Sequence, residues 1–240
     1  MGSIKLFKVL GITVFLDWTW FLLAYFEFQW GRNDPRYSGV AWHMVEFVSI
    51  FVIVLLHEFG HALACRSVGG TADRIVLWPL GGIAYVQPPM RPGAMLWSIA
   101  AGPLVNVALL PVLYVLYLLT QTMSAPADVQ RLLFYVQFIN AAILIFNLLP
   151  IYPLDGGQIM QSLLWFKMGF ARSLRAATRI GIVAAIALGS LALYTGRYWT
   201  VVIAAFIGYQ CWLGIQTARR LIERETLGYE QNPDDAQDRR

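Results

Sequence analysis

Long apolar segments alternate with short polar connections along most of this chain. A helix needs about 20 consecutive, mostly apolar residues to cross the hydrocarbon core of a bilayer, and six segments approach that length. They lie at residues 16–29, 46–67, 94–119, 131–150, 179–195 and 198–217. The pattern predicts a polytopic α-helical membrane protein with about six transmembrane helices. Because the connection near Gly196 is short, we expect the last two helices to form an antiparallel hairpin.

The connection at residues 68–93 departs from this pattern. It holds two short apolar runs separated by a proline and a Gly-Gly pair within residues 79–82, which is typical of a β-hairpin. We expect this hairpin near residues 70–86, and the segment Val9 to Phe15 could add a further strand. Open strand edges cannot face lipid, so this small membrane-associated sheet must be shielded by helices or face a polar cleft.

The composition supports a membrane protein. Hydrophobic residues make up 58% of the 240 residues and charged residues 13%, whereas soluble domains average about 25% charged residues. The net charge of +4 is too small to indicate a nucleic-acid-binding protein. The two cysteines, Cys65 and Cys211, do not make a disulfide framework, so we interpret them as reduced core residues. No small-residue cleavage site follows the first apolar stretch, so a removed signal peptide is not expected.

Lysine and arginine positions orient the six predicted helices. With the N-terminus in the cytoplasm, 14 of the 18 basic residues fall on the cytoplasmic side. The four that fall outside are Arg32, Arg36, Arg131 and Arg197. We therefore expect both termini in the cytoplasm, with residues 1–218 forming one membrane domain. Residues 219–240 should form a polar cytoplasmic tail whose last ten residues have the composition of a disordered segment.

The second predicted helix carries titratable residues inside an apolar run, in the sequence IVLLHEFGHALAC at residues 53–65. A charge at the bilayer centre costs at least about 2.5–3.5 kcal/mol on insertion scales. His57 and His61 are four residues apart and share one helix face, where both can bind one metal ion. Glu58 lies beside that face and can reach a metal-bound water, as in the H-E-x-x-H motif of zinc peptidases. The alternative is a pair of core histidines bonded to carbonyl groups, which the trio disfavours.

A catalytic zinc ion needs a third protein ligand. Cys65 continues the same helical row but lies about 12 Å along the axis from His57, and His43 lies about 20 Å away in the other direction. Asp155 remains, in FNLLPIYPLDGGQIM at residues 146–160, where prolines end the fourth helix and two glycines allow close backbone approach. Asp155 could instead N-cap the short helix that follows. Beside an otherwise incomplete zinc site, we favour ligation.

The two motifs together resemble the site-2 protease family of intramembrane zinc metalloproteases. The resemblance rests on HEFGH in one helix and NLLPIYPLDGG in a later one, and it covers about residues 9–166. It includes AGPLVN at residues 101–106, which is similar to the family's Gly-x-x-x-Asn element. The ligands that the resemblance implies for a single catalytic Zn²⁺ are His57, His61 and Asp155.

The resemblance also implies an activity and its residues. Glu58 would be the catalytic glutamate, and Asn147, together with Asn106, would help to stabilise the oxyanion. The reaction would be hydrolysis of a peptide bond in or near a transmembrane segment of a membrane protein. The hairpin near residues 70–86 would bind the substrate as an added strand.

The expected partners are single-span or other transmembrane protein substrates and the lipid bilayer, with no nucleic acid. The expected location is a prokaryotic inner membrane. Two attachments common in the family are not found in this sequence, namely a PDZ-sized insert between the helices and a pair of CBS domains after the last one. Their absence leaves the mode of regulation and of substrate selection open.

Two other functions compete with proteolysis. A zinc or other divalent-metal transporter can also carry H-E-x-x-H on a membrane helix, but it needs acidic or histidine residues along several helices. This chain has three histidines in all. A catalytically inactive membrane scaffold would tolerate loss of Glu58, whereas here Glu58, both histidines of the motif and Asp155 are all present.

Overall fold

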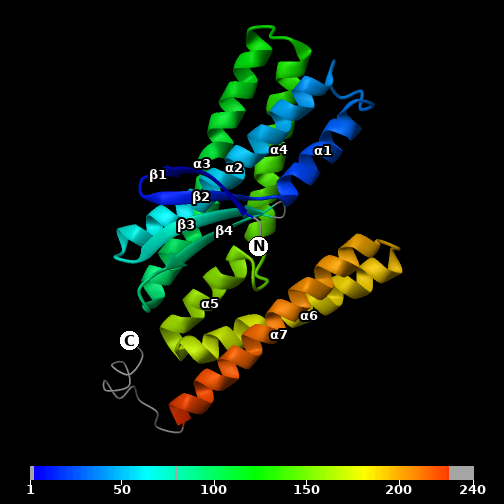
Figure 1. The fold of residues 1–240 in the computed structure, drawn as a ribbon. Helices are drawn as coiled ribbons and strands as arrows, with labels where there is room; N and C mark the ends of the chain where they lie inside the picture. The colour runs from blue at the N-terminus through cyan, green and yellow to red at the C-terminus, as the bar shows by residue number, and fades with distance from the viewer. Residues whose placement is uncertain (1–2, 79–80, 227–240) are drawn as a thin grey trace. The chain divides into compact units, whose positions relative to one another are not determined.

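The structure is a computed structural model of the 240-residue chain, and it describes residues 3–78 and 81–226 (Figure 1). The chain divides into two compact units, Met1–Leu148 and Leu149–Arg240. The turn predicted between the strands of the hairpin falls on residues 79–80, and the end of the predicted tail falls on residues 227–240. Both lie outside the described residues.

Among its described residues, the first unit contains a four-stranded sheet and four helices. In chain order these are β1 (Ser3–Val9), β2 (Ile12–Asp17), α1 (Thr19–Gly31), α2 (Val40–Ser67), β3 (Thr71–Trp78), β4 (Gly81–Gln87), α3 (Pro92–Thr122) and α4 (Ala127–Asn147). The strand order is β1-β2-β3-β4, in which β2 and β3 are parallel and the other two pairs are antiparallel. This confirms the predicted hairpin as β3 and β4. The further strand predicted at Val9 to Phe15 corresponds to β2 from Ile12 onward, and its first three residues belong to the end of β1 and the turn. The two edges of the sheet are β1 and β4.

The sheet packs against α2 through alternate residues of its two central strands. Ile12 and Val14 of β2 and Ile75 and Leu77 of β3 are fully buried, and they form one core cluster that includes Cys65 of α2. Alternate residues of a strand point to the same face, so this pattern gives the sheet one apolar face. Burying each such side chain contributes about 1.5–3 kcal/mol. The packing fixes the sheet beside the helix that carries the histidine pair.

A tight turn ties the edge hairpin to the end of α2. Leu10 and Gly11 join β1 to β2 with positive φ angles of 50° and 76°, as a two-residue hairpin turn of the right hand requires. The guanidinium group of Arg66, in the last turn of α2, donates to the carbonyl oxygens of both turn residues. These bonds satisfy backbone groups at the end of the sheet and also place a positive charge at the helix C-terminus, where it is favourable.

Within the described residues, five helices are long and apolar enough to cross a membrane. They are α2, α3, α4 and, in the second unit, α6 (Phe170–Tyr194) and α7 (Tyr198–Thr226). Many of their large apolar side chains are exposed, including Val183 and Ile186 of α6, as expected for side chains that face lipid. These helices confirm five of the six predicted segments.

The prediction that one membrane helix fills residues 16–29 is wrong. The structure places there the end of β2 and the helix α1, which has 13 residues and spans about 20 Å. The reason is local: the Asp17 carboxylate accepts the Thr19 N–H at 3.0 Å, so the strand ends and the helix begins at this point. Asp17 is buried and bonds to Thr19 across the strand–helix junction. The sequence predicts a longer helix because the apolar residues of β2 extend the hydrophobic run.

The second unit consists of α5 (Asp155–Met168) and a long antiparallel hairpin of α6 and α7 (Figure 1). Gly169, with φ of 80°, separates α5 from α6, and Gly196, with φ of 69°, lies in the short connection between α6 and α7. The hairpin predicted at Gly196 is confirmed. Both of its helices are longer than expected, because α6 begins at Phe170 and α7 continues to Thr226.

The two cysteines are core residues in their separate units. Both are buried, and neither is in a disulfide, as predicted. The Cys65 thiol donates to the Thr71 carbonyl oxygen at 3.4 Å, and the Cys211 thiol donates to the Tyr152 carbonyl oxygen at 2.9 Å. Each thiol therefore joins a helix to the backbone of a neighbouring segment.

Candidate metal centre

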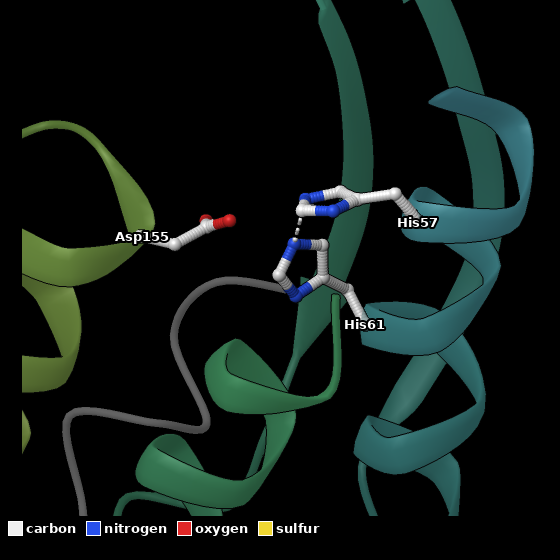
Figure 2. A group of neighbouring side chains, drawn as sticks. All are labelled: His57, His61 and Asp155. Atoms are coloured by element: carbon white, nitrogen blue, oxygen red, sulfur yellow. Dashed lines mark hydrogen bonds between the residues drawn. The ribbon is translucent and has the colours of Figure 1, made fainter. Parts of the chain in front are cut away.

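Three buried titratable side chains lie on one side of α2. His57, Glu58 and His61 have exposed fractions of 4%, 6% and 8%. The two imidazole rings meet edge to face, with 4.7 Å between their centroids and 82° between their planes. Their Nε2 atoms are 3.1 Å apart (Figure 2). The four-residue spacing of the histidines therefore brings one nitrogen of each ring to a common point.

The other nitrogen of each ring is held by an oxygen acceptor on α3. His57 Nδ1 lies 2.6 Å from Asn106 Oδ1, and His61 Nδ1 lies 2.9 Å from the Ser98 carbonyl oxygen. Oxygens of this kind only accept, so both contacts favour the tautomer that has its hydrogen on Nδ1 and its lone pair on Nε2. With this tautomer on both rings, a cation between the two Nε2 atoms would be bound by both lone pairs. In a tetrahedral zinc site, bonds of about 2.0–2.1 Å separate two ligand nitrogens by about 3.3 Å, which is close to the observed spacing.

A glycine on α3 makes room for both rings. A Cβ atom at Gly102 would lie 2.3 Å from His61 Nε2 and 2.8 Å from His57 Nε2. Asn106 follows one helical turn later on the same face. A second glycine, Gly60 of α2, allows close helix contact, because a Cβ atom there would lie 2.7 Å from the Ala101 carbonyl oxygen. In the sequence AGPLVN, the four-residue spacing of Gly102 and Asn106 is the physical signal that these two residues share one helix face.

The carboxylate of Glu58 contacts the edge of the sheet. Its Oε2 accepts the backbone N–H of Ala84 in β4 at 3.0 Å. β4 pairs only with β3 among the described strands, and Ala84 therefore presents this N–H on the open side of the strand. Glu58 thus lies beside the edge of β4 that no described strand pairs with, and an edge of this kind can pair with an extended peptide.

Asp155 belongs to the second unit, where it is the first residue of α5. Leu154 occupies the N-cap position, so the alternative that Asp155 is the N-cap is wrong. A carboxylate in the first helical turn is favoured by the helix dipole. A Cβ atom at Gly157 would lie 2.3 Å from the Tyr152 nitrogen, and this confirms the close backbone approach predicted for the Gly-Gly pair. The loop before α5 folds back on the helix start and holds Asp155 at its end.

The coordinating atoms of His57, His61 and Asp155 lie within 4.8 Å of one another (Figure 2). Two imidazoles and one carboxylate make a ligand set that suits zinc and leaves a fourth position for water. His43 and Cys65 are not in this group, in agreement with the helical distances. Within the described residues, His43 lies instead beside Arg36 and Glu27.

The two asparagines named from the sequence lie in different surroundings. Asn147 is the last residue of α4 and is partly buried, and its role stays a prediction. Asn106 is fully buried. Its Oδ1 contacts His57 Nδ1, and its Nδ2 donates to Asn140 Oδ1 at 2.8 Å. Both polar atoms of the Asn106 amide are therefore engaged away from the Nε2 side of the histidines.

Comparison with known proteins gives a consistent result. The model of peptidase family M50 matches residues 45–125 and 118–188. A zinc metalloprotease of Methanocaldococcus jannaschii is 29% identical over 227 residues, which cover 94% of this chain and 63% of the relative. Stage IV sporulation protein FB of Bacillus subtilis is 29% identical over 156 residues, or 63% of this chain and 51% of that protein. The chain thus spans between half and two thirds of the length of these curated relatives.

A solved structure is similar in fold. The site-2 protease from Methanocaldococcus jannaschii superposes with a TM-score of 0.61 at 26% identity, and the match covers 89% of this chain and 95% of that one. The similarity therefore extends over both units of the chain.

Replacing Gly102 with Ala should disrupt the histidine pair. The new methyl group would occupy the space of both Nε2 atoms, so the rings must move. We expect zinc affinity to fall by at least about tenfold, the lower end of the effect of changing groups that orient metal ligands. The measurement is zinc competition with a chelator on purified protein. Gly208→Ala is the matched control, because its Cβ atom would meet only the Ala185 Cβ at 3.8 Å. Equal affinities for the two variants would show that Gly102 is not needed.

Proposed function

Because the chain belongs to peptidase family M50, we propose that it is an intramembrane zinc metalloprotease of the site-2 protease type. Its reaction is hydrolysis of a peptide bond in or near a transmembrane segment of another membrane protein. The observation that carries the proposal is the facing pair of Nε2 atoms on α2, 3.1 Å apart, within a group that includes Asp155. This pair lies on a helix that is long and apolar enough to cross a membrane.

In the proposed mechanism, His57, His61 and Asp155 hold one Zn²⁺ ion. When bound there, the ion polarises the attacking water and the scissile carbonyl group. Glu58 accepts a proton from the water as its oxygen bonds to the carbonyl carbon. Glu58 then gives the proton to the amine that leaves when the C–N bond breaks. Asn147 donates to the oxyanion from its side-chain amide.

Charge balance supports this assignment. The carboxylates of Asp155 and Glu58 would together balance the charge of a divalent cation, to which imidazole ligands in their metal-binding form add none. A site with no formal net charge is less costly to bury in an apolar helix bundle than an isolated ion, because the desolvation penalty grows steeply with uncompensated charge. The apolar run around the motif is therefore compatible with a bound ion.

The open edge of β4 supports binding of the substrate as an added strand. A substrate helix hides its peptide bonds in intrahelical hydrogen bonds, so it must unwind before hydrolysis. Pairing with β4 would satisfy the released backbone groups. The bond between the Ala84 N–H and Glu58 places this edge directly beside the proposed catalytic carboxylate. An added strand would therefore run past the group that activates the water.

We further propose a prokaryotic inner-membrane protein with both termini in the cytoplasm and a catalytic domain at residues 1–218. This topology needs six crossings, of which five correspond to helices of sufficient length. The sixth is α1, whose 13 residues require local thinning of the bilayer. Exposed apolar side chains along α1, such as those of Phe21 and Phe26, support contact with lipid. The substrates would be single-span or other transmembrane proteins.

Nothing in the comparisons favours a metal transporter, since the curated relative from Methanocaldococcus jannaschii is named a zinc metalloprotease. An inactive scaffold would not cleave a membrane-protein substrate, whereas a protease would. Cleavage assays on the variants below distinguish these two functions.

A Glu58→Gln variant should keep zinc and lose proteolysis. The glutamine side chain retains an oxygen that can accept the Ala84 N–H, but it cannot take up the proton of water. General acid–base groups contribute about 10²–10⁴-fold to rates, so we expect a loss of that size. The assay is cleavage of a single-span substrate in liposomes, with zinc content measured in parallel. Undiminished cleavage would reject both the role of Glu58 and the proposed mechanism.

An Asp155→Ala variant should lose zinc. Removing a direct ligand should cost more than the roughly 10–100-fold loss seen when an orienting partner is removed. Zinc content and affinity of the purified protein are the measurements. Asp73→Ala removes a carboxylate whose side chain is 83% exposed and serves as the control. If Asp155→Ala retains wild-type zinc affinity, Asp155 is not a ligand.

A Val86→Pro variant tests strand addition. Alternate residues of an edge strand present their N–H groups outward, so Val86 is the next outward donor after Ala84, the residue whose N–H donates to Glu58. Proline is tolerated on an edge strand, and its missing N–H should raise KM for a transmembrane substrate several-fold with little change in kcat. Leu6→Pro, at the irregularity between Lys5 and Phe7 of the opposite edge, is the control. Identical kinetics for both variants would exclude pairing with β4.

A further inference from the structure

Two fully buried asparagines connect α3 to α4 behind the histidine pair. Asn106 of α3 and Asn140 of α4 both have 0% exposure. The Asn106 Nδ2 donates to the Asn140 Oδ1 at 2.8 Å, and the Asn140 Nδ2 donates to the Asn106 backbone oxygen at 3.0 Å. Asn140 is thus held by two bonds to one residue, and that residue also contacts His57.

The direction of these bonds follows from one backbone oxygen. The Asn106 carbonyl can only accept, so Asn140 must turn its Nδ2 toward it. This leaves Asn140 Oδ1 facing the Asn106 side chain, which must then present its own Nδ2. The Asn106 Oδ1 is left to face His57, 2.6 Å from Nδ1. Each amide therefore has one favourable orientation.

The opposite orientation of Asn106 would disable the histidine. An Nδ2 group facing His57 would need a lone pair on Nδ1, which moves the imidazole hydrogen to Nε2. A protonated Nε2 cannot bind a metal ion. The orientation of a single amide thus decides which ring nitrogen of His57 carries the hydrogen, and so whether the Nε2 atom that faces His61 offers a lone pair.

We propose that Asn140, which acts through Asn106, is a positioning residue that sets the tautomer of His57 for zinc binding. The inference rests on the proposed zinc site but not on proteolysis. It gives Asn106 a positioning role in place of the oxyanion role suggested by the family resemblance. Metal-binding histidines commonly use a carboxylate for this purpose. Here an amide performs it without adding a charge to an apolar helix bundle.

The first test is the zinc affinity of Asn140→Leu, measured by chelator competition on the purified full chain. We expect a loss of about tenfold or more, as for other groups that orient metal ligands. Gln137→Leu makes the same type of change one turn earlier on α4, at a partly buried position, and should leave the affinity unchanged. Equal affinities of Asn140→Leu and wild type would overturn the proposal.

A double-mutant cycle tests whether Asn140 affects zinc affinity through Asn106 or independently of it. We call the chain of bonds from Asn140 through Asn106 to His57 the relay. Because Asn140 acts only through Asn106, the double variant Asn106→Leu/Asn140→Leu should bind zinc as weakly as Asn106→Leu alone. Independent contributions would instead multiply, and that result would contradict the relay. Asn140→Asp should restore most of the affinity lost in Asn140→Leu, since a buried neutral carboxyl group offers the same acceptor and donor. This variant also tests whether the effect of leucine is merely a packing defect.

The tautomer can be observed directly. The chain has three histidines, so ¹⁵N-histidine labelling gives few imidazole signals, and the His57 signal is assigned by its loss in His57→Gln. In zinc-free wild-type protein, we expect the hydrogen of His57 on Nδ1, and in Asn140→Leu a larger share on Nε2. An unchanged tautomer would overturn the proposal even if cleavage were normal. Failure of wild-type protein to cleave any substrate, with the tautomer shift present, would count only against the proposed function.

Discussion

The site depends on the close approach of two imidazole nitrogens that lie on successive turns of one helix. Within an apolar helix, His57 and His61 hold their Nε2 atoms 3.1 Å apart, and this arrangement is stable only if each ring is fixed from behind. The fixing groups are an amide oxygen and a backbone carbonyl oxygen of α3. α3 must therefore lie very close to α2, and Gly102 and Gly60 are the residues that permit it. The close packing of α2 and α3 and the orientation of the two histidine rings therefore depend on each other.

The same constraint explains why the partners of the histidines are neutral. Water is scarce at membrane depth, so every formal charge near the metal must be balanced locally. Two carboxylates already match a divalent cation. A further carboxylate behind His57 would leave one negative charge uncompensated, whereas the amide of Asn106 provides an acceptor at no cost in charge. An amide can present either its oxygen or its NH₂ group to His57. The two bonds between Asn140 and Asn106 favour the orientation in which the oxygen of Asn106 faces the ring.

The sequence predicts the parts of this site that follow from spacing within one helix. The four-residue separation of His57 and His61 places both on one face regardless of tertiary structure. Two prolines mark the break before Asp155, and two glycines follow it. The relay of Asn106 and Asn140 was not predictable, because it depends on the register between α3 and α4, which apolar periodicity leaves undetermined. The first helix was overestimated for a related reason. A buried strand and a membrane helix are both apolar, and only the bond between Asp17 and Thr19 separates β2 from α1.

The outer edge of β4 carries backbone N–H groups that need hydrogen-bond acceptors inside a membrane. Unpaired N–H groups are costly where water is absent, and Ala84 meets this cost by donating to Glu58. Glu58 can accept this bond at one position of β4, while the neighbouring outward donors need acceptors from elsewhere. An extended peptide supplies a carbonyl oxygen at every second residue, whereas a helix supplies none, because its carbonyls are already bonded along its own axis. The edge therefore favours a locally unwound segment over an intact helix. In the proposed mechanism, the energy of pairing would offset the cost of unwinding beside the proposed catalytic carboxylate of Glu58.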